Sequence, residues 1–269
     1  MPVAALALAL GSAVLHAAWN LLLARARDVQ AATAVMFVLS VAMALPFALA
    51  WWAARPSVWP YALASTLLEA VYVVALSYGY RLTDLSLVYP LTRGLAPVLT
   101  LAAAVLLLGH RPSAWEVAGV VVVAVGVVLV RGPRGPGDAR ALLLVSVIAA
   151  SIAAYTLVDR AGIHRAGALP YFVLVLAGPC LVYPPLVGWH AMRRELSASV
   201  VLGSVAMLLS FALGLLALRR GAAAPVLAVR SASIVFATLL AGRLLSEHVS
   251  RTRLTGSLLV FAGVALLAV

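Results

Sequence analysis

The sequence predicts an all-α, polytopic membrane protein with ten transmembrane helices arranged as two inverted five-helix repeats. Three observations lead to this fold class. Hydrophobic residues make up 65% of the 269 residues and charged residues only 10%. The apolar residues form runs long enough to cross a bilayer. The second half of the sequence repeats features of the first half at a fixed shift.

The composition excludes several classes of protein. Soluble domains are only about 45–50% apolar, because they need a polar surface. A mean hydropathy of +1.12 and a single cysteine exclude a disordered chain and a disulfide scaffold. The nineteen basic residues, all arginine, exceed the eight acidic ones and give a net charge of +11. Because they are scattered between apolar runs, we interpret them as helix-end anchors at lipid headgroups and expect no nucleic acid partner.

Ten apolar runs define the predicted spans. A helix needs ~20 apolar residues to cross the hydrocarbon core. Short gaps of charged and turn-forming residues separate the runs, which lie at 3–24, 31–53, 58–79, 85–108, 114–131, 140–158, 169–189, 198–218, 223–246 and 252–268. The gaps are too short for a soluble catalytic module, so we expect the function to reside between the helices.

A shift of 137 residues superposes the two halves of the sequence. Arginines and glycines of the first half then fall on identical residues of the second: Arg93 on Arg230, Gly119 on Gly256 and Gly126 on Gly263. Five spans per repeat is an odd number, so the second repeat enters the membrane from the opposite side. We therefore expect two inverted units, residues 1–132 and 138–269, with a substrate site near the midplane where they meet.

The first run carries a polar face. His16, Trp19 and Asn20 lie on one side of a helix through their i, i+3 and i+4 spacing. Such a face either lines a cavity or forms hydrogen bonds across helices. We predict that Trp19 and Asn20 bind substrate. His16 is a candidate for proton coupling because histidine titrates near neutral pH, with a hydrogen-bonded structural histidine as the alternative.

Three charged residues stand out because they lie well inside predicted spans, and a charge at the bilayer centre costs at least ~2.5–3.5 kcal/mol. They are Glu69 in the third run, Arg93 in the fourth and Arg230 in the ninth. One interpretation is a structural ion pair between Glu69 and one arginine. Since two arginines face one carboxylate, we expect one guanidinium to bind a substrate carboxylate or phosphate. Glu69 is the stronger candidate for proton coupling, because burial disfavours a charged carboxylate.

Further residues are expected to line the same cavity. Pro90 and Pro97 flank Arg93 and predict a bent fourth helix, whose freed carbonyls need protein or a water-filled cavity beside them. The ninth run has a weaker polar break around Arg230. The sixth run places Tyr155 and Asp159 on one face, with Asp159 near the membrane edge. We predict that Tyr72, Tyr89 and Tyr155 join Arg93 and Arg230 as substrate-binding residues.

Pairs of glycines recur in the fifth and tenth runs. Gly119 and Gly126 lie two turns apart on one helix face, and Gly256 and Gly263 repeat that spacing. Small residues so placed let helices approach closely. We expect them to serve packing between the halves or in a homodimer.

Two stretches resemble a known family. Residues 15–20 (LHAAWN) and 84–97 (DLSLVYPLTRGLAP), together with Gly119 and Gly126, resemble EamA-type carriers of the drug/metabolite transporter superfamily. The resemblance covers essentially the whole chain. It implies ten helices in two inverted halves and the movement of small metabolites, often outward, with amino acids as a recurring substrate class. The family often has a glutamate at the end of the fourth helix of each half; Glu247 fits this pattern, and His110 departs from it.

The resemblance also implies cytoplasmic termini, which we keep as the expectation. With that orientation more arginines fall in the exterior gaps than in the cytoplasmic ones, whereas the positive-inside rule favours the reverse.

Together these features predict a multi-pass transporter of the inner (plasma) membrane. We expect it to move a small anionic or zwitterionic, amino-acid-like metabolite by alternating access, as an exporter. We expect no enzymatic activity, cofactor or metal. An intramembrane enzyme is one alternative, although no nucleophile–base motif is present. A lipid-carrier flippase is the other, and it would need a lateral opening between helices.

Overall fold

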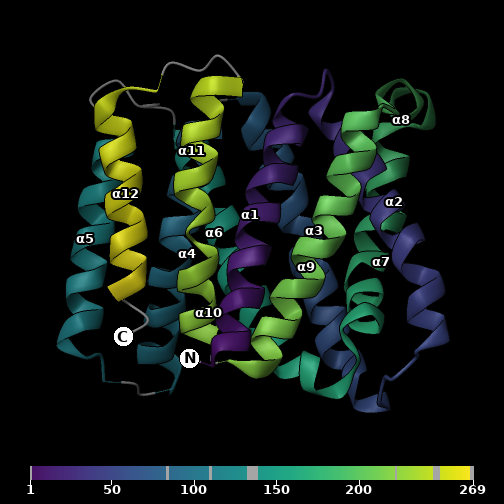
Figure 1. Cartoon of the computed structure of the whole chain (residues 1–269), viewed down its shortest axis with the longest axis horizontal. Coiled ribbons are helices and arrows are strands. Elements are labelled where there is room, and N and C mark those ends of the chain that lie inside the picture. Colours follow the sequence, from purple (N-terminus) through teal and green to yellow (C-terminus); the bar gives the residue numbers. More distant parts are fainter. Residues whose placement is uncertain are drawn as a thin grey trace.

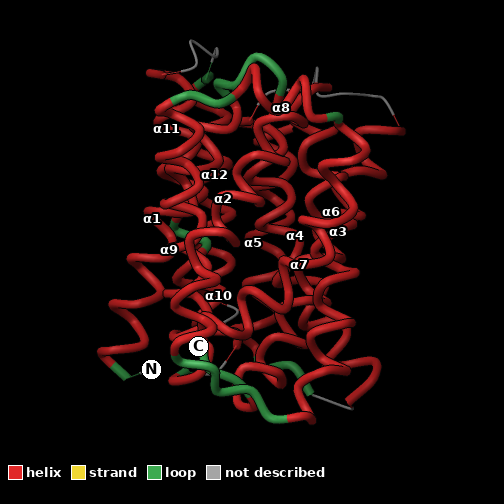
Figure 2. The backbone as a smooth tube through the Cα atoms, turned by 90° about the vertical axis from the view of Figure 1, so that its right-hand side faces the viewer, coloured by secondary structure: helices red, strands yellow, loops and turns green. Residues whose placement is uncertain are grey.

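The computed structural model describes residues 2–82, 85–108, 111–131, 139–221, 223–244 and 249–266. These residues form an upright bundle of helices without strands (Figure 1). Loops gather at the two ends of the bundle (Figure 2). Both marked chain ends lie at the same end of the bundle, which we call the N-terminal face (Figure 1). His110 and Glu247 lie outside the described residues.

Each of the ten predicted runs contains helix. The helices are α1 (Val3–Ala24), α2 (Val29–Ala50), α3 (Trp59–Leu82), α4 (Leu85–Leu108), α5 (Ala114–Arg131), α6 (Ala139–Gly162), α7 (Ala168–Val187), α8 (Trp189–Glu195), α9 (Ala198–Arg220), α10 (Ala223–Arg230), α11 (Ser233–Leu244) and α12 (Arg251–Leu266). Within the described residues, six segments are long and apolar enough to cross a membrane, and Ala114–Val130 is a shorter apolar helix. The chain is thus an all-helical protein with several candidate membrane spans, and the count of ten spans stays a prediction.

Helix α3 shows that the bundle is polar inside and apolar outside. Leu63, Leu67 and Val71 are exposed on its outer face, whereas Ser65 and Glu69 are buried. A water-soluble helix has the opposite arrangement, with its apolar stripe toward the core. An apolar exterior instead suits the hydrocarbon of a bilayer.

Capping residues fix where two of the helices begin. The Asp28 side chain accepts hydrogen bonds from the backbone N–H groups of Gln30 (3.0 Å) and Ala31 (3.1 Å) at the start of α2. Ser113 and Glu116 form a reciprocal capping box at the start of α5. These bonds satisfy backbone donors that the first turn of a helix leaves without partners.

Helices from the two halves of the sequence pack against each other in pairs. α1 packs along α9 and α3 along α6, while α2 packs against α7 and α5 against α12. In the first pair, the Ser12 hydroxyl donates to the Ser210 carbonyl (2.7 Å) and the Ser210 hydroxyl donates back to the Ser12 carbonyl (2.9 Å). The centre of the molecule is therefore built from both halves.

The predicted glycine positions bring α5 and α12 into backbone contact. A Cβ atom on Gly126 would lie 2.8 Å from the Gly256 carbonyl oxygen, and one on Gly263 would lie 2.7 Å from the Val123 nitrogen. Even an alanine side chain would not fit between these backbones. The glycines thus serve packing between the halves, as one of the two sequence interpretations expected.

The ninth predicted run is two helices rather than one. α10 ends at Arg230 and α11 begins at Ser233, and α10 lies below α11 in the same column (Figure 1). Serine hydroxyls stabilise this break: Ser231 donates to the Leu227 carbonyl (2.9 Å) and Ser233 to the Arg230 carbonyl (2.7 Å). By contrast, α4 is one continuous helix despite Pro90 and Pro97.

Candidate functional site

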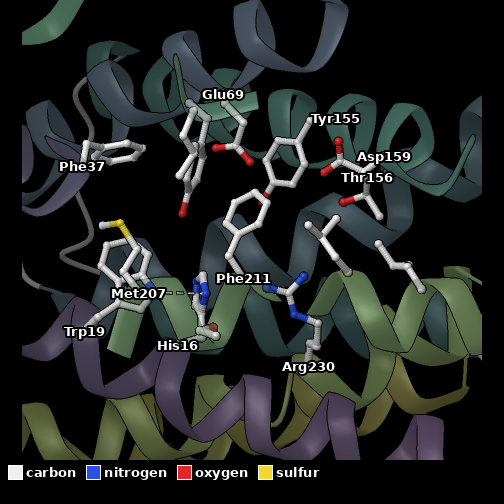
Figure 3. Close-up of a pocket in the computed structure, with 15 residues that line it drawn as sticks. His16, Trp19, Phe37, Glu69, Tyr155, Thr156, Asp159, Met207, Phe211 and Arg230 are labelled. Atoms are coloured by element: carbon white, nitrogen blue, oxygen red, sulfur yellow. Dashed lines mark hydrogen bonds between the residues drawn. The ribbon is translucent and has the colours of Figure 1, made fainter. Parts of the chain in front are cut away.

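A buried cavity lies between α1, α2, α3, α6, α7, α9 and α10. The charged and titratable residues that line it include His16, Glu69, Asp159 and Arg230. The aromatic residues that line it include Trp19, Phe37, Tyr72, Tyr155 and Phe211. Glu69, Tyr155 and Asp159 lie on one side, while His16 and Arg230 lie on the other (Figure 3). The space open to the centre of a water-sized sphere is about 30 Å³. That volume holds a water molecule or two, since one water needs roughly 10–15 Å³ on this measure.

Arg230 points into this cavity from the last residue of α10 (Figure 3). Its Nε atom is buried and has no hydrogen-bond partner among the described residues. Gly214 of α9 makes room for the guanidinium, because a Cβ atom at that position would lie 3.0 Å from Arg230 Cζ. A guanidinium presents its donors in a fixed planar fork that matches a carboxylate. This arginine therefore has donor capacity to offer to a ligand.

Arg93, the matching arginine of the first half, lies behind the cavity wall. It is 4% exposed and is not among the residues that line the cavity. Its guanidinium contacts His16 Nε2 and lies over the Tyr89 ring, with Cζ 5.8 Å from the ring centroid. The two sequence-equivalent arginines thus have different surroundings.

His16 lies between two hydrogen-bond donors. The Trp19 indole N–H donates to His16 Nδ1 (3.3 Å), and the Arg93 guanidinium contacts His16 Nε2. A protonated imidazole would have two N–H donors of its own and would find no acceptor at either neighbour. A neutral imidazole can accept at one of its two nitrogens, so this geometry favours a neutral His16 over a charged one.

Glu69 is 1% exposed and lines the cavity opposite Arg230 (Figure 3). Its Oε1 atom is buried and has no hydrogen-bond partner in the described part of the chain. A carboxylate oxygen without a donor is costly at this depth. Either a proton or a cationic group of a ligand would satisfy it.

Asp159 also lines the cavity, from the helix face that it shares with Tyr155. Its side chain is 2% exposed. Its Oδ1 atom accepts hydrogen bonds from the Ser65 hydroxyl (2.6 Å) and the Tyr171 hydroxyl (3.0 Å). The i, i+4 spacing to Tyr155 was the sequence signal for this position.

The remaining predicted residues divide into cavity walls and supports. Tyr72 and Tyr155 line the cavity with their rings edge to face, 5.6 Å apart. Trp19 also lines it. Asn20 and Tyr89 are not among the lining residues: Asn20 donates to the His16 carbonyl of its own helix (2.8 Å), and the Tyr89 hydroxyl donates to Ser233 (2.9 Å).

Arg160 follows Asp159 near the end of α6. Its guanidinium donates to the carbonyl of Leu218, a cavity-lining residue of α9 (2.7 Å), and contacts His164 Nε2 (2.6 Å). Residues of α6 and α9 are joined here next to the buried carboxylate.

Apolar helix faces turned outward and a cavity with buried charged groups between the helices are the features of a polytopic helical membrane protein. Residues 3–132 match the family model described as the EamA-like transporter family. The match covers just under half of the chain, and over that stretch the sequence is similar to this transporter family.

The other comparisons bear on the fold. Chains of solved structures match this protein, among them a crystal structure that is 20% identical over 99% of this chain and 96% of the other, with a TM-score of 0.67. This likeness shows that the fold is shared along the whole chain. No curated protein matches it.

Proposed function

We propose that the protein moves a small anionic or zwitterionic, amino-acid-like metabolite across the membrane by alternating access, as an exporter of the inner membrane. The observation that carries this proposal is Arg230, a half-buried arginine that lines the cavity and whose buried Nε atom has no hydrogen-bond partner among the described residues. Glu69, whose Oε1 is also unbonded, lies on the opposite wall. A substrate carboxylate would bind the first group, and a substrate ammonium or a coupling proton would bind the second.

The remaining predicted residues have two kinds of role in this proposal. Trp19, Tyr72 and Tyr155 form the walls that contact the substrate. Arg93, Tyr89 and Asn20 act from behind those walls, by holding His16 and the break between α10 and α11. His16 then orients Arg93 and does not carry the coupling proton.

The small volume of the cavity supports alternating access. A space of about 30 Å³ accepts water but not a metabolite, so the lining helices must separate before a substrate enters. The helix break beside Arg230 supplies a flexible point at the site itself. In the two sequence halves α1 corresponds to α6, and α3 corresponds to α9. The α1–α9 pair and the α3–α6 pair are therefore equivalent, which supports the inverted-repeat arrangement. The glycine contacts between α5 and α12 join helices of one chain, so the homodimer stays a separate prediction.

Transport by purified protein in proteoliposomes tests the function. We expect counterflow of radiolabelled solutes from a mixture of L-amino acids and small dicarboxylates. Arg230→Ala and Arg93→Ala should abolish it while the variants still fold and insert, because each removes a guanidinium of the site. Arg220→Ala removes an exposed arginine at the end of α9 and serves as the control. Unchanged flux in the Arg230 variant would remove this arginine from the mechanism.

A further inference from the structure

Glu69 and Asp159 are two buried carboxylates on the same side of the cavity (Figure 3). Ser65, which donates to Asp159, precedes Glu69 by four residues on α3. Residues four apart lie on one helix face, with Cβ atoms about 5–6 Å apart. The hydrogen bond between Ser65 and Asp159 therefore places the two carboxylates about one helical turn from each other.

The two carboxylates differ in their hydrogen bonds. Asp159 Oδ1 accepts from two hydroxyl groups, which stabilise a charged carboxylate. Glu69 Oε1 is buried without any donor among the described residues, so this end of the pair needs a proton or another cation. Two like charges so close in a site shielded from solvent are unfavourable. A single proton shared between them removes that repulsion.

The cavity provides a route between the two groups and toward one face. Both carboxylates line it, and its volume accepts a water molecule that could connect them. Asp159 is the residue nearer the N-terminal face, since it lies beside the contact that joins Arg160 to Leu218. Glu69 is the residue opposite Arg230.

We propose that Glu69 and Asp159 form one proton-binding pair, in which Asp159 exchanges the proton with the N-terminal face and Glu69 holds it beside the substrate site. This inference rests on the proposed transport function. A proton from water adds to the Asp159 carboxylate and passes through cavity water to Glu69, and Asp159 becomes charged again. One proton moves, and no group is oxidised or reduced.

Other titratable and charged groups surround the pair and set its electrostatic environment. They are Tyr72 of α3, Tyr155 of α6, Tyr171 of α7, His16 of α1, Arg93 of α4 and Arg230 of α10. The two arginines favour a charged carboxylate near them, whereas the tyrosines are neutral near pH 7.

Infrared difference spectroscopy of the purified full-length protein tests the pairing without any substrate. The protonated-carboxyl band is followed against pH in the wild type, Glu69→Gln and Asp159→Asn. If the two groups share a proton, removal of one should shift the titration of the other to lower pH by about one unit or more. Glu195→Gln is the control, because this 8%-exposed carboxylate lies at the other end of the bundle and accepts from the Asp28 backbone N–H.

A second measurement decides between failure of the pair and failure of the proposed function. In proteoliposomes, Glu69→Gln and Asp159→Asn should each lose at least about tenfold of the solute accumulation driven by a pH gradient, and Glu195→Gln should keep it. Unshifted titrations in both single variants would overturn the pair, as would normal accumulation by Asp159→Asn. Absence of counterflow in the wild type would instead overturn the transport function, and the infrared shifts would still decide the pairing.

Discussion

Arg93 and Arg230 occupy matching positions in the two halves of the sequence, yet their surroundings differ. Arg93 lies in the continuous helix α4, contacts His16 and covers the Tyr89 ring. Arg230 ends the short helix α10, faces the cavity and leaves its buried Nε unbonded. The comparison teaches that charges at matching positions of the two sequence halves can differ in role because their neighbours differ. One arginine supports the site, and the other is available to a ligand.

The strongest test of this comparison is the effect of each arginine on stability. Arg230→Met removes a half-buried charge whose buried Nε atom is unbonded among the described residues and should raise the free energy of unfolding by about 1–4 kcal/mol. Arg93→Met loses the contacts with His16 and Tyr89 and should lower it by about 1–3 kcal/mol. Thermal unfolding of the purified variants in detergent measures both. Shifts of the same sign would mean that the two arginines have equivalent surroundings.

A smaller effect is expected at Gly214, which leaves room for the Arg230 guanidinium. Gly214→Ala would place a Cβ atom 3.0 Å from Arg230 Cζ, so the guanidinium must move. We expect about tenfold weaker substrate binding, equivalent to about 1.4 kcal/mol. Gly79→Ala is the matched control, since its nearest neighbour would lie at an ordinary 3.5 Å. Concentration dependence of the counterflow checks both variants, and equal effects would show that Gly214 does not position Arg230.

The smallest effect concerns the link between the two arginine regions. The Tyr89 hydroxyl donates to Ser233, and Ser233 donates to the Arg230 carbonyl. Tyr89→Phe removes the first bond and should cost about 1 kcal/mol of unfolding free energy. In a double-mutant cycle with Ser233→Ala, the two losses should not add, because the residues share one hydrogen bond. Additive losses would show that this bond contributes nothing.

The sequence predicted the helices well because membrane spans follow from apolar length and from charged gaps. It also singled out the residues that cost energy to bury, and six of the nine predicted site residues line the cavity: His16, Trp19, Glu69, Tyr72, Tyr155 and Arg230. Depth in the membrane can be read from the position of a residue within its run. Hydropathy cannot show which side of a helix faces the cavity, so Asn20, Tyr89 and Arg93 were not separated from the lining residues.

Two further differences have local causes. The predicted span over 223–246 is two helices that meet at 231–232, where the sequence showed a weaker polar break around Arg230. Serine hydroxyls bond backbone carbonyls at this point, but the apolar pattern did not show that the helix would end there. Asp159 was not among the predicted substrate-binding or proton-coupling residues, and the sequence did not show that its carboxylate would accept hydrogen bonds from hydroxyls of α3 and α7.

The small volume of the cavity has a practical consequence for ligand discovery. Under the proposed alternating access, a solute larger than water would bind only to molecules whose helices have separated, and its measured dissociation constant would rise as the fraction of such molecules falls. Genuine substrates will therefore register as weak binders in screens at micromolar concentration. Mutations that stabilise the state with separated helices would raise the measured affinity in the same screen without adding a contact to the ligand.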